Sequence, residues 1–303
     1  MSHGNKKKHA FTIKIFVAVF GAFMLLVDPF GEKESVIRMM SNIETNGKPD
    51  IQGNADEESK PLMHTFYHHV GGEKDMLNVW KDLWSEAGFE TKILTLDDAK
   101  QHPYFEEMEK SVKPLFGESY NAMCYYRWLA MATTGGGWMS DYDTLPTNYP
   151  LHLHEELPNN GKFTAHDQHI PDLMSGTESE WTRVAKLLVE AIPRIPANIN
   201  PKSDMHSLLV LLHESENKNS GKNNGIIFSR KTQAGFPYKS ARQVDCGLIE
   251  TAWAIHLSHS DTASAWDNGL FPIENFEGQA SHHRAEAAKI LWGDIMEQCQ
   301  RSN

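Results

Sequence analysis

The stretch YYRWLAMATTGGGWMSDYDTLP, residues 125–146, decides which fold the sequence predicts. Its apolar first part indicates a helix that ends at Gly135–Gly137, because glycine readily takes the left-handed conformation that closes helices. Residues 138–140 then predict a short strand, and Asp141 and Asp143 follow it directly. Side chains two apart on a strand point the same way, so the two carboxylates are expected to converge. Their mutual repulsion must then be offset by positive charge.

The segments on either side of this stretch alternate between strand and helix patterns. Strands are predicted at 62–69, 91–96, 162–166 and 226–230, and helices at 73–88, 103–115, 120–134, 177–191, 203–213 and 282–300. Residues 175–177 are predicted to be a turn, and Thr177 with Glu180 fits a capping box at the start of the next helix. This order predicts an α/β domain with a mostly parallel central sheet flanked by helices. Ligands of such sheets bind at the carboxyl ends of the strands, where Asp141 and Asp143 are expected.

The N-terminal part of the chain has a different composition. Four lysines and no acidic residue lie in a predicted cytosolic tail, 1–14, and an apolar run predicts a single transmembrane signal anchor at 15–30. Residues 31–60 are polar and predict a disordered stem, which leaves 61–303 as one lumenal domain. The lysines before the anchor predict a single-pass type II protein of the Golgi or endoplasmic reticulum membrane. A cleaved signal peptide, which would make the protein secreted, and a buried helix are the alternatives.

Composition limits the classes of function. The chain has 303 residues, 40% of them hydrophobic, which is enough for a large core, and a net charge of −11. Because no basic stripe follows the tail, a nucleic-acid partner is not expected. Three cysteines, Cys124, Cys246 and Cys299, allow one disulfide in an oxidising compartment, and the sequence does not choose the pair. Three buried thiols are an equal alternative.

Two convergent carboxylates are typical ligands of a hard divalent cation. Mg²⁺ and Mn²⁺ prefer oxygen ligands, and by keeping open coordination positions they can also hold a diphosphate. The alternative is that Asp141, Tyr142 and Asp143 form a polar turn that ends at Pro146.

The surrounding pattern adds a family resemblance. An arginine on a helix, a glycine pair, three residues and then Asp-x-Asp resemble the DxD sugar-binding region of mannosyl- and galactosyl-transferring glycosyltransferases, which are type II membrane enzymes. Here these positions are Arg127, Gly136, Gly137, Asp141 and Asp143. The resemblance implies a single Rossmann-like, A-type nucleotide-sugar-binding domain. It also implies transfer of a sugar from a nucleoside diphosphate sugar to a glycan, glycoprotein or glycolipid acceptor, with Mn²⁺ or Mg²⁺ as cofactor.

The chain departs from the family pattern at two places. Arg127 lies one residue farther from the glycine pair than the pattern has it, as though Gly135 were inserted. Met123 and Cys124 stand where the family has a Ser-Asp pair, so the role of that acid has no counterpart here.

The resemblance also implies roles for single residues. Asp141 and Asp143 would bind the donor and the metal, with a histidine after a later apolar strand on the opposite side; His256 is the candidate and His259 the second choice. Arg127 would contact the donor or brace the aspartates, with an exposed helix arginine as the alternative. His64 lies in the segment that resembles the family's first strand, whose end borders the nucleotide.

The sequence does not identify a catalytic residue. The related enzymes retain the anomeric configuration, which removes the need for an obvious general base. Asp167 and Asp204 are candidates for contacting donor or acceptor, and a surface acid or a helix cap is the alternative for each.

Two other functions fit parts of the sequence. The segment DYDTL also fits haloacid-dehalogenase-type phosphatases, with Asp141 as nucleophile and Asp143 as acid/base. That chemistry requires a later acid cluster, for which the chain offers only Gly293-Asp294 in its last predicted helix. The other alternative is a membrane-tethered protein that binds glycans without turnover.

Overall fold

The computed structural model describes residues 60–69, 73–147, 156–217, 223–270 and 283–299. The chain divides into two units, Met1–Asp56 and Glu57–Asn303, and all described residues belong to the second. No helix in these ranges is long and apolar enough to cross a membrane. The predicted tail, the anchor at 15–30 and the stem up to residue 59 lie outside the described residues.

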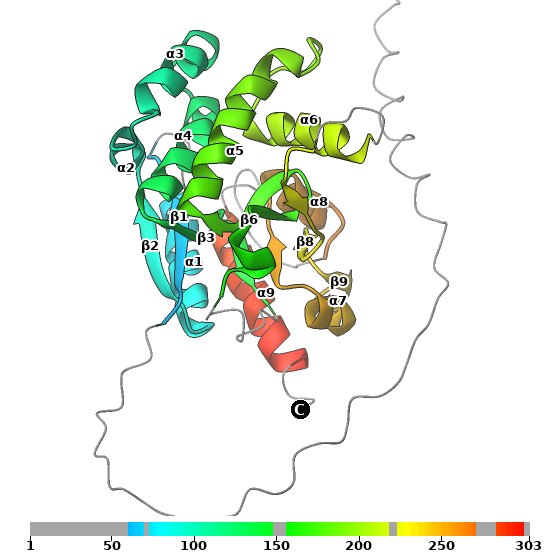
Figure 1. The fold of residues 1–303 in the computed structure, drawn as a ribbon. Helices are drawn as coiled ribbons and strands as arrows, with labels where there is room; N and C mark the ends of the chain where they lie inside the picture. Colours follow the sequence, from blue (N-terminus) through cyan, green and yellow to red (C-terminus); the bar gives the residue numbers. More distant parts are fainter. Residues whose placement is uncertain (1–59, 70–72, 148–155, 218–222, 271–282, 300–303) are drawn as a thin grey trace, which may run out of the picture. The chain divides into compact units, whose positions relative to one another are not determined.

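A six-stranded sheet in the order β2-β1-β3-β6-β5-β7 forms the centre of the domain (Figure 1). Its strands are β1 Leu62–Phe66, β2 Glu90–Leu94, β3 Gly136–Ser140, β5 Thr164–Asp167, β6 Ile170–Thr177 and β7 Ile227–Phe228. Strand β1 pairs in parallel with β2 and β3, and β5 with β7, while β6 is antiparallel to both β3 and β5. The prediction of an α/β domain with a mostly parallel sheet is therefore confirmed.

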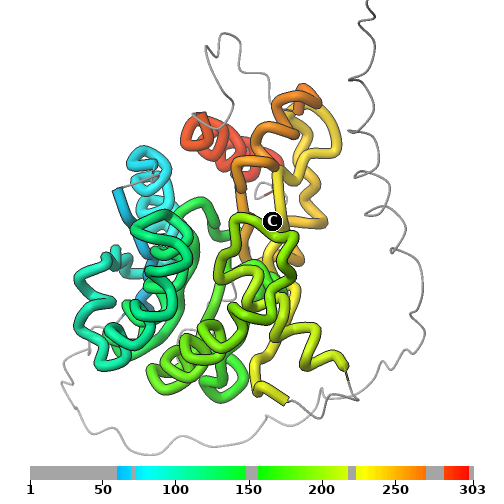
Figure 2. Tube along the Cα trace, turned by 90° about the horizontal axis from the view of Figure 1, so that it is seen from above, coloured from blue at the N-terminus to red at the C-terminus, as the bar shows by residue number. Residues whose placement is uncertain are grey.

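Helices cover both faces of this sheet. They are α1 Lys74–Glu86, α2 Leu96–Lys100, α3 Phe105–Phe116, α4 Tyr120–Thr133, α5 Glu178–Ala191, α6 Asp204–Glu216, α7 Cys246–Thr251, α8 His259–Asp267 and α9 Arg284–Gln298, with short 3₁₀ turns at Pro158–Gly161 and Ile192–Arg194. Met139 and Met174 pack among the helices from α2 to α6, and Trp138 and Leu173 pack against α1. Figures 1 and 2 show α4 and α5 on one side of the sheet and α1 and α9 on the other. Burial of both faces is what a mostly parallel sheet requires.

A smaller sheet continues from the end of β3. It contains β4 Thr144–Pro146, β11 Ala254–His256 and β8 Thr232–Ala234 in the order β4-β11-β8, beside a separate pair of β9 Tyr238–Ser240 and β10 Gln243–Val244. In the antiparallel register of β4 and β11, His256 stands opposite Thr144. A residue about 110 positions later in the chain therefore lies next to the DYD segment.

Strand β6 is the main element that the sequence did not predict. Residues 175–177, expected as a turn, are its last three residues, and all its positions from Pro171 to Gly176 are buried. A strand buried on both faces lacks the alternation of apolar and polar residues that marks a half-exposed strand. Helix α2 was also not predicted.

The capping box predicted at residues 177–180 does not form, although Thr177 is the N-cap residue of α5. Its hydroxyl lies 3.1 Å from the Ser179 hydroxyl, and Glu180 instead accepts from the Phe163 backbone N–H at 2.9 Å and pairs with Arg183. Glu180 therefore contacts the backbone just before β5 and does not cap its own helix.

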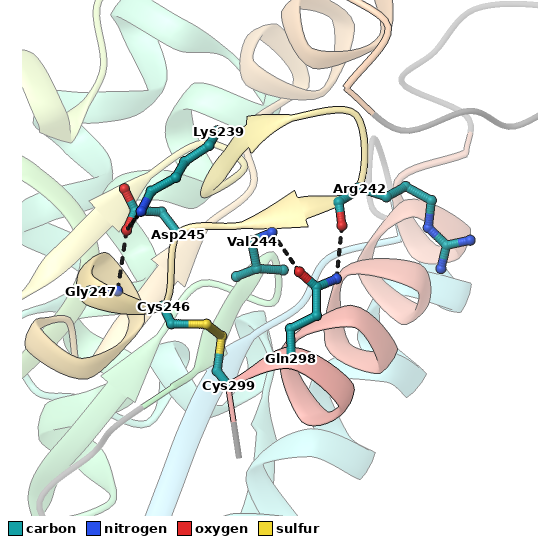
Figure 3. The surroundings of a disulfide bond; sticks show 8 residues. All are labelled: Lys239, Arg242, Val244, Asp245, Cys246, Gly247, Gln298 and Cys299. Carbon is teal, nitrogen blue, oxygen red and sulfur yellow. Dashed lines mark hydrogen bonds and ion pairs between the residues drawn. A yellow bond between two sulfur atoms is a disulfide. The ribbon is translucent and has the colours of Figure 1, made fainter. Parts of the chain in front are cut away.

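One disulfide, Cys246–Cys299, closes a sequence separation of 53 residues with its Cα atoms 5.3 Å apart, and Cys124 is a buried free thiol. Figure 3 shows this bond at the carboxyl end of α9. Beside it, the Gln298 side chain accepts from the Val244 N–H at 3.0 Å and donates to the Arg242 carbonyl at 2.8 Å. The end of α9 is thus fixed to α7 and β10 by a covalent bond and two hydrogen bonds.

We predict that the disulfide contributes about 2–4 kcal/mol to the free energy of unfolding, because it restricts the unfolded chain. In urea unfolding, a reductant should lower the stability of the wild type by that amount and leave Cys246→Ser/Cys299→Ser, which is already destabilised, unchanged. Equal stability of the wild type with and without reductant would show that the bond is absent in the folded protein.

Candidate active site

A cavity of about 830 Å³ opens at the carboxyl ends of β1 and β3. Its lining includes Phe66 at the end of β1, Asp141 and Asp143 after β3, His256 at the end of β11 and Arg284 at the start of α9. Cavities at the carboxyl ends of parallel strands are the usual ligand sites of α/β sheets. The sequence therefore placed the two aspartates at the correct edge of the sheet.

The turn between β3 and β4 aims both aspartates into this cavity. The Asp141 N–H donates to the Asp172 carbonyl at 2.8 Å, and the Thr144 N–H donates to the Asp141 carbonyl at 2.9 Å. The Leu257 N–H, in turn, donates to the Asp143 carbonyl at 2.8 Å. Asp141, Asp143 and His256 each offer a ligand atom within 4.8 Å of the others. The predicted convergence of these three side chains is present in the fold.

Two tryptophans of α1 hold the ends of the strands on each side of this turn. Trp80 donates its indole N–H to the Ser140 hydroxyl at 2.7 Å, and Trp84 donates to the Thr144 carbonyl at 2.9 Å. Both side chains are fully buried, so these bonds form away from water, where an unmade bond is costly. The position of the turn is thereby fixed from the helix below it.

Arg127, on α4, is a brace for Asp141. Its side chain is 7% exposed, and its Nη1 donates to Asp141 Oδ1. Its Nε and Nη2 donate to Asp204 Oδ2 at 3.0 and 2.7 Å. Of the interpretations that the sequence left open, the structure favours bracing, and the exposed helix arginine is wrong.

Asp204 is buried behind Arg127 and is not a surface acid. Its Oδ2 also accepts from the Trp128 indole N–H at 2.9 Å, and its Oδ1 accepts from the Met205 N–H at 2.8 Å. A carboxylate with this many donors is a structural counter-ion for Arg127.

Arg284 performs the equivalent task for Asp143 and was not predicted. Its Nη1 donates to Asp143 Oδ2 at 2.5 Å and to the Leu257 carbonyl at 3.0 Å, and its Nε donates to Glu73 at 3.1 Å. A cation in the first turn of a helix is disfavoured by the helix dipole and needs acidic partners elsewhere, which is the one local signal for this role.

The environment of the acids affects their protonation. Burial raises the pKa of Asp141 to about 6, with Arg127 opposing the rise and Asp143 adding to it. Burial also raises the pKa values of Asp167 and Asp172, a pair of acids behind His256. For Asp172 the charge of Asp167 adds to that effect.

The residues present fit a divalent cation. Each aspartate is paired with an arginine through one oxygen, which leaves its second oxygen for a metal, and Asp143 Oδ1 lies 3.5 Å from His256 Nε2. Carboxylate oxygens and an imidazole nitrogen are ligands that Mn²⁺ accepts. Three protein ligands leave coordination positions open for a substrate.

Three other predicted residues do not join this cluster. His64 is buried within β1, where its Nδ1 lies 2.9 Å from the Trp138 carbonyl, and it is not among the residues that line the cavity. The end of the same strand, at Phe66, does border the cavity. Asp167 lies behind His256 and outside the cavity lining, and His259 faces Glu73 at 2.8 Å.

The structure does not place Asp294 where the phosphatase alternative requires an acid. Asp294 accepts from the Tyr238 hydroxyl at 2.8 Å and from Arg242 Nε at 3.1 Å, and it is not among the residues that line the cavity. Asp141, which would be the nucleophile, is held by Arg127 through one oxygen.

Comparisons with known proteins give little functional information. A family model described as a domain of unknown function (DUF8765) matches residues 63–158, which include both aspartates. No curated protein matches the chain. The crystal structure of a glycosyltransferase involved in the glycosylation of the major capsid of PBCV-1 is similar with a TM-score of 0.38 and 10% identity, over 75% of this chain and 99% of that one. A likeness of this size carries no functional argument.

We predict that Asp204→Leu lowers the free energy of unfolding by about 3–5 kcal/mol, because it leaves the buried Arg127 guanidinium with one partner fewer. Asp204→Asn, whose amide oxygen still accepts hydrogen bonds, should lose less. Urea unfolding measures both, with Asp97→Ala as an exposed control whose stability should stay close to that of the wild type. A stability of Asp204→Leu equal to that of the control would mean that Asp204 is a free acid.

Proposed function

We propose that this protein is a metal-dependent glycosyltransferase that moves a sugar from a nucleoside diphosphate sugar to a glycan or other acceptor. The observation that carries the proposal is the convergence of Asp141, Asp143 and His256 on one cavity at the carboxyl ends of β1 and β3. Asp141 and Asp143 also belong to the stretch that resembles the sugar-binding region of glycosyltransferases. Geometry and sequence pattern thus support the same chemistry independently.

The volume and the charge of the cavity suit such a donor. A volume of about 830 Å³ is within the range of cavities that enclose small-molecule ligands. Asp141 and Asp143 hold Mn²⁺ or Mg²⁺ together with His256 in this proposal. The bound cation supplies Lewis-acid stabilisation of the negative charge that develops on the departing diphosphate.

The protein's own residues contribute orientation and charge balance. Arg127 and Arg284 each fix one oxygen of an aspartate, which sets the direction of the other oxygen before any ligand arrives. Such preorganisation lowers the cost of reaching the charged transition state.

The acids that line the cavity help to indicate whether the transferred sugar would keep its anomeric configuration. Among the described residues that line it, the carboxylates are Asp141, Asp143 and Asp204, and each is paired with an arginine. In this proposal the second oxygens of Asp141 and Asp143 bind the cation, and Asp204 is held by Arg127, Trp128 and the Met205 N–H, so none of these three acts as a general base toward an acceptor hydroxyl. We therefore propose transfer with retention of configuration, in which such a base is not required.

The cellular location that we propose is the lumen of the Golgi or endoplasmic reticulum, with residues 15–30 as a type II anchor. The Cys246–Cys299 bond supports an oxidising compartment, since disulfides rarely persist in the cytosol. The lysines before the apolar run support the orientation.

Asp143→Ala should reduce Mn²⁺-dependent transfer or hydrolysis of a nucleoside diphosphate sugar by about 100-fold or more, because the cation loses a ligand at the leaving group. The measurement is release of free nucleotide across a donor panel, and unchanged near- and far-ultraviolet circular dichroism shows that the fold is intact. Asp97→Ala, whose exposed carboxylate pairs with Lys100, should keep full activity.

Two outcomes would contradict the proposal. Donor binding without turnover would favour a non-catalytic glycan-binding protein. Cleavage of a generic phosphomonoester without donor binding would favour a phosphatase.

The proposed orientation predicts that a reporter fused after Lys60 is protected from protease in intact vesicles and digested once detergent is added. The reason is that the predicted anchor ends at residue 30, so everything after it would lie in the lumen. Digestion of the reporter in intact vesicles would place the domain in the cytosol.

A further inference from the structure

Asp172, on β6, carries the least satisfied buried carboxyl group in the described part of the chain. The residue is 0% exposed, and neither Oδ1 nor Oδ2 makes a hydrogen bond of regular geometry. A buried polar group without a partner costs about 1–3 kcal/mol, and more if it is charged. Such a group in a folded protein calls for a specific explanation.

The nearest candidate partner is His256. Its Nδ1 lies 3.7 Å from Asp172 Oδ2, while its Nε2 lies 3.5 Å from Asp143 Oδ1. The imidazole therefore stands between an acid that lines the cavity and an acid that is sealed behind it. Asp167, whose Oδ2 is also without a partner, lies beside Asp172 on the sealed side.

A cation can coordinate only one of the two nitrogens of the His256 imidazole. Neutral imidazole has one lone pair and one N–H, so a metal on one nitrogen leaves the hydrogen on the other. Asp167, Asp172 and His256 have the spacing of a metal cluster of their own, but the two acids do not line the cavity. Asp141 and Asp143 do line it, which assigns the lone pair to Nε2 and the hydrogen to Nδ1.

We propose that Asp172 is a positioning residue that accepts the Nδ1–H hydrogen bond of His256 and so presents the Nε2 lone pair to the cation site of Asp141 and Asp143. The inference rests on the proposed function for the presence of the cation. Carboxylate–histidine–metal arrangements of this kind fix both the tautomer and the orientation of the ring.

The same arrangement gives a hydrogen-bond partner to both carboxyl oxygens of Asp172 and to Oδ2 of Asp167. A carboxyl group that keeps its proton still has an acceptor oxygen. Asp172 can therefore donate an O–H to Asp167 through one oxygen and accept from His256 through the other. The role assigned to Asp172 does not depend on its charge.

The fold also gives Asp172 a second connection to the site. Its backbone carbonyl accepts from the Asp141 N–H at 2.8 Å, because β6 runs antiparallel to β3 as far as the Ser140–Leu173 pair. One residue thus holds the backbone of the first aspartate and the side chain of the histidine.

The tautomer of His256 tests the proposal without any ligand. In the metal-free, ¹⁵N-labelled protein, two-bond correlations of the imidazole should show Nδ1 protonated, and His256→Gln identifies the signals. Protonation of Nε2 instead would overturn the proposal, because that nitrogen would then have no lone pair for a metal.

Mn²⁺ affinity, measured from the electron paramagnetic resonance of the free ion, tests the consequence. Asp172→Leu removes the acceptor and should weaken binding by about 10–100-fold. Asp172→Asn can donate to Asp167 and accept from His256 as a neutral carboxyl does, so it should bind nearly as tightly as the wild type. Asp294→Leu, which removes an equally buried acid held by Arg242 and Tyr238, should lose stability and keep its Mn²⁺ affinity.

The results of these experiments distinguish a failure of the positioning role of Asp172 from a failure of the glycosyltransferase proposal. Equal losses in Asp172→Leu and Asp172→Asn, or an equal loss in Asp294→Leu, would overturn the positioning role. A wild type that binds no Mn²⁺ would also overturn it. If the tautomer and the affinities are as expected but no donor sugar is ever transferred, the positioning role stands and the glycosyltransferase proposal fails. If Asp172→Leu does not fold, the tautomer of His256 in the wild type still tests the positioning role.

Discussion

The repulsion between Asp141 and Asp143 is the constraint on which the site depends. Two like charges about 4 Å apart near a protein surface repel by about 4 kcal/mol, so a fold that holds them together must supply positive charge. It does so from two directions: Arg127 reaches Asp141 from α4, and Arg284 reaches Asp143 from α9. Each arginine in turn has a second acidic partner, Asp204 or Glu73, that fixes its position.

This requirement explains why the last helix matters to a site that begins in the middle of the chain. Helix α9 has 15 residues, about 22 Å in length, with Arg284 at one end and the Cys246–Cys299 bond just after the other. Because a helix of this length is stiff, anchoring its far end also restricts the end that holds Asp143. The disulfide, remote from the cavity, and the ion pair at the cavity therefore belong to one supporting element.

The sequence predicted the structural features that depend on residues close to one another in the chain. The helix that ends just before Gly135 and the short strand after the glycines follow from local residue preferences, and the structure contains both. The two aspartates converge as expected, but the turn between β3 and β4 brings them together, and not the alternation of side chains along a strand. His256 was found only through the family resemblance, and its position depends on the pairing of β11 with β4. The sequence did not show which residue of β1 reaches the cavity, because the position at which a strand ends depends on its pairing with other strands; Phe66 lines the cavity and His64 does not.

Other features could not be predicted because distant segments create them. Arg284, Asp172 and the choice of Cys246 with Cys299 depend on contacts between segments far apart in sequence. Strand β6 is buried on both faces, which removes the alternation by which a strand is recognised. Glu180 bonds to the Phe163 N–H, just before β5, and does not form the expected cap. In each case tertiary packing overrode the local pattern.

The central claim is that Asp141, Asp143 and His256 hold a cation that binds the diphosphate of a sugar donor. The most direct measurement is thermal unfolding of the protein with a panel of nucleoside diphosphate sugars, each with and without Mn²⁺. A donor at 100 times its dissociation constant should stabilise the fold by about 2.7 kcal/mol, and only when Mn²⁺ is present. A shift of the same size without the metal, or no shift with any donor, would contradict the account.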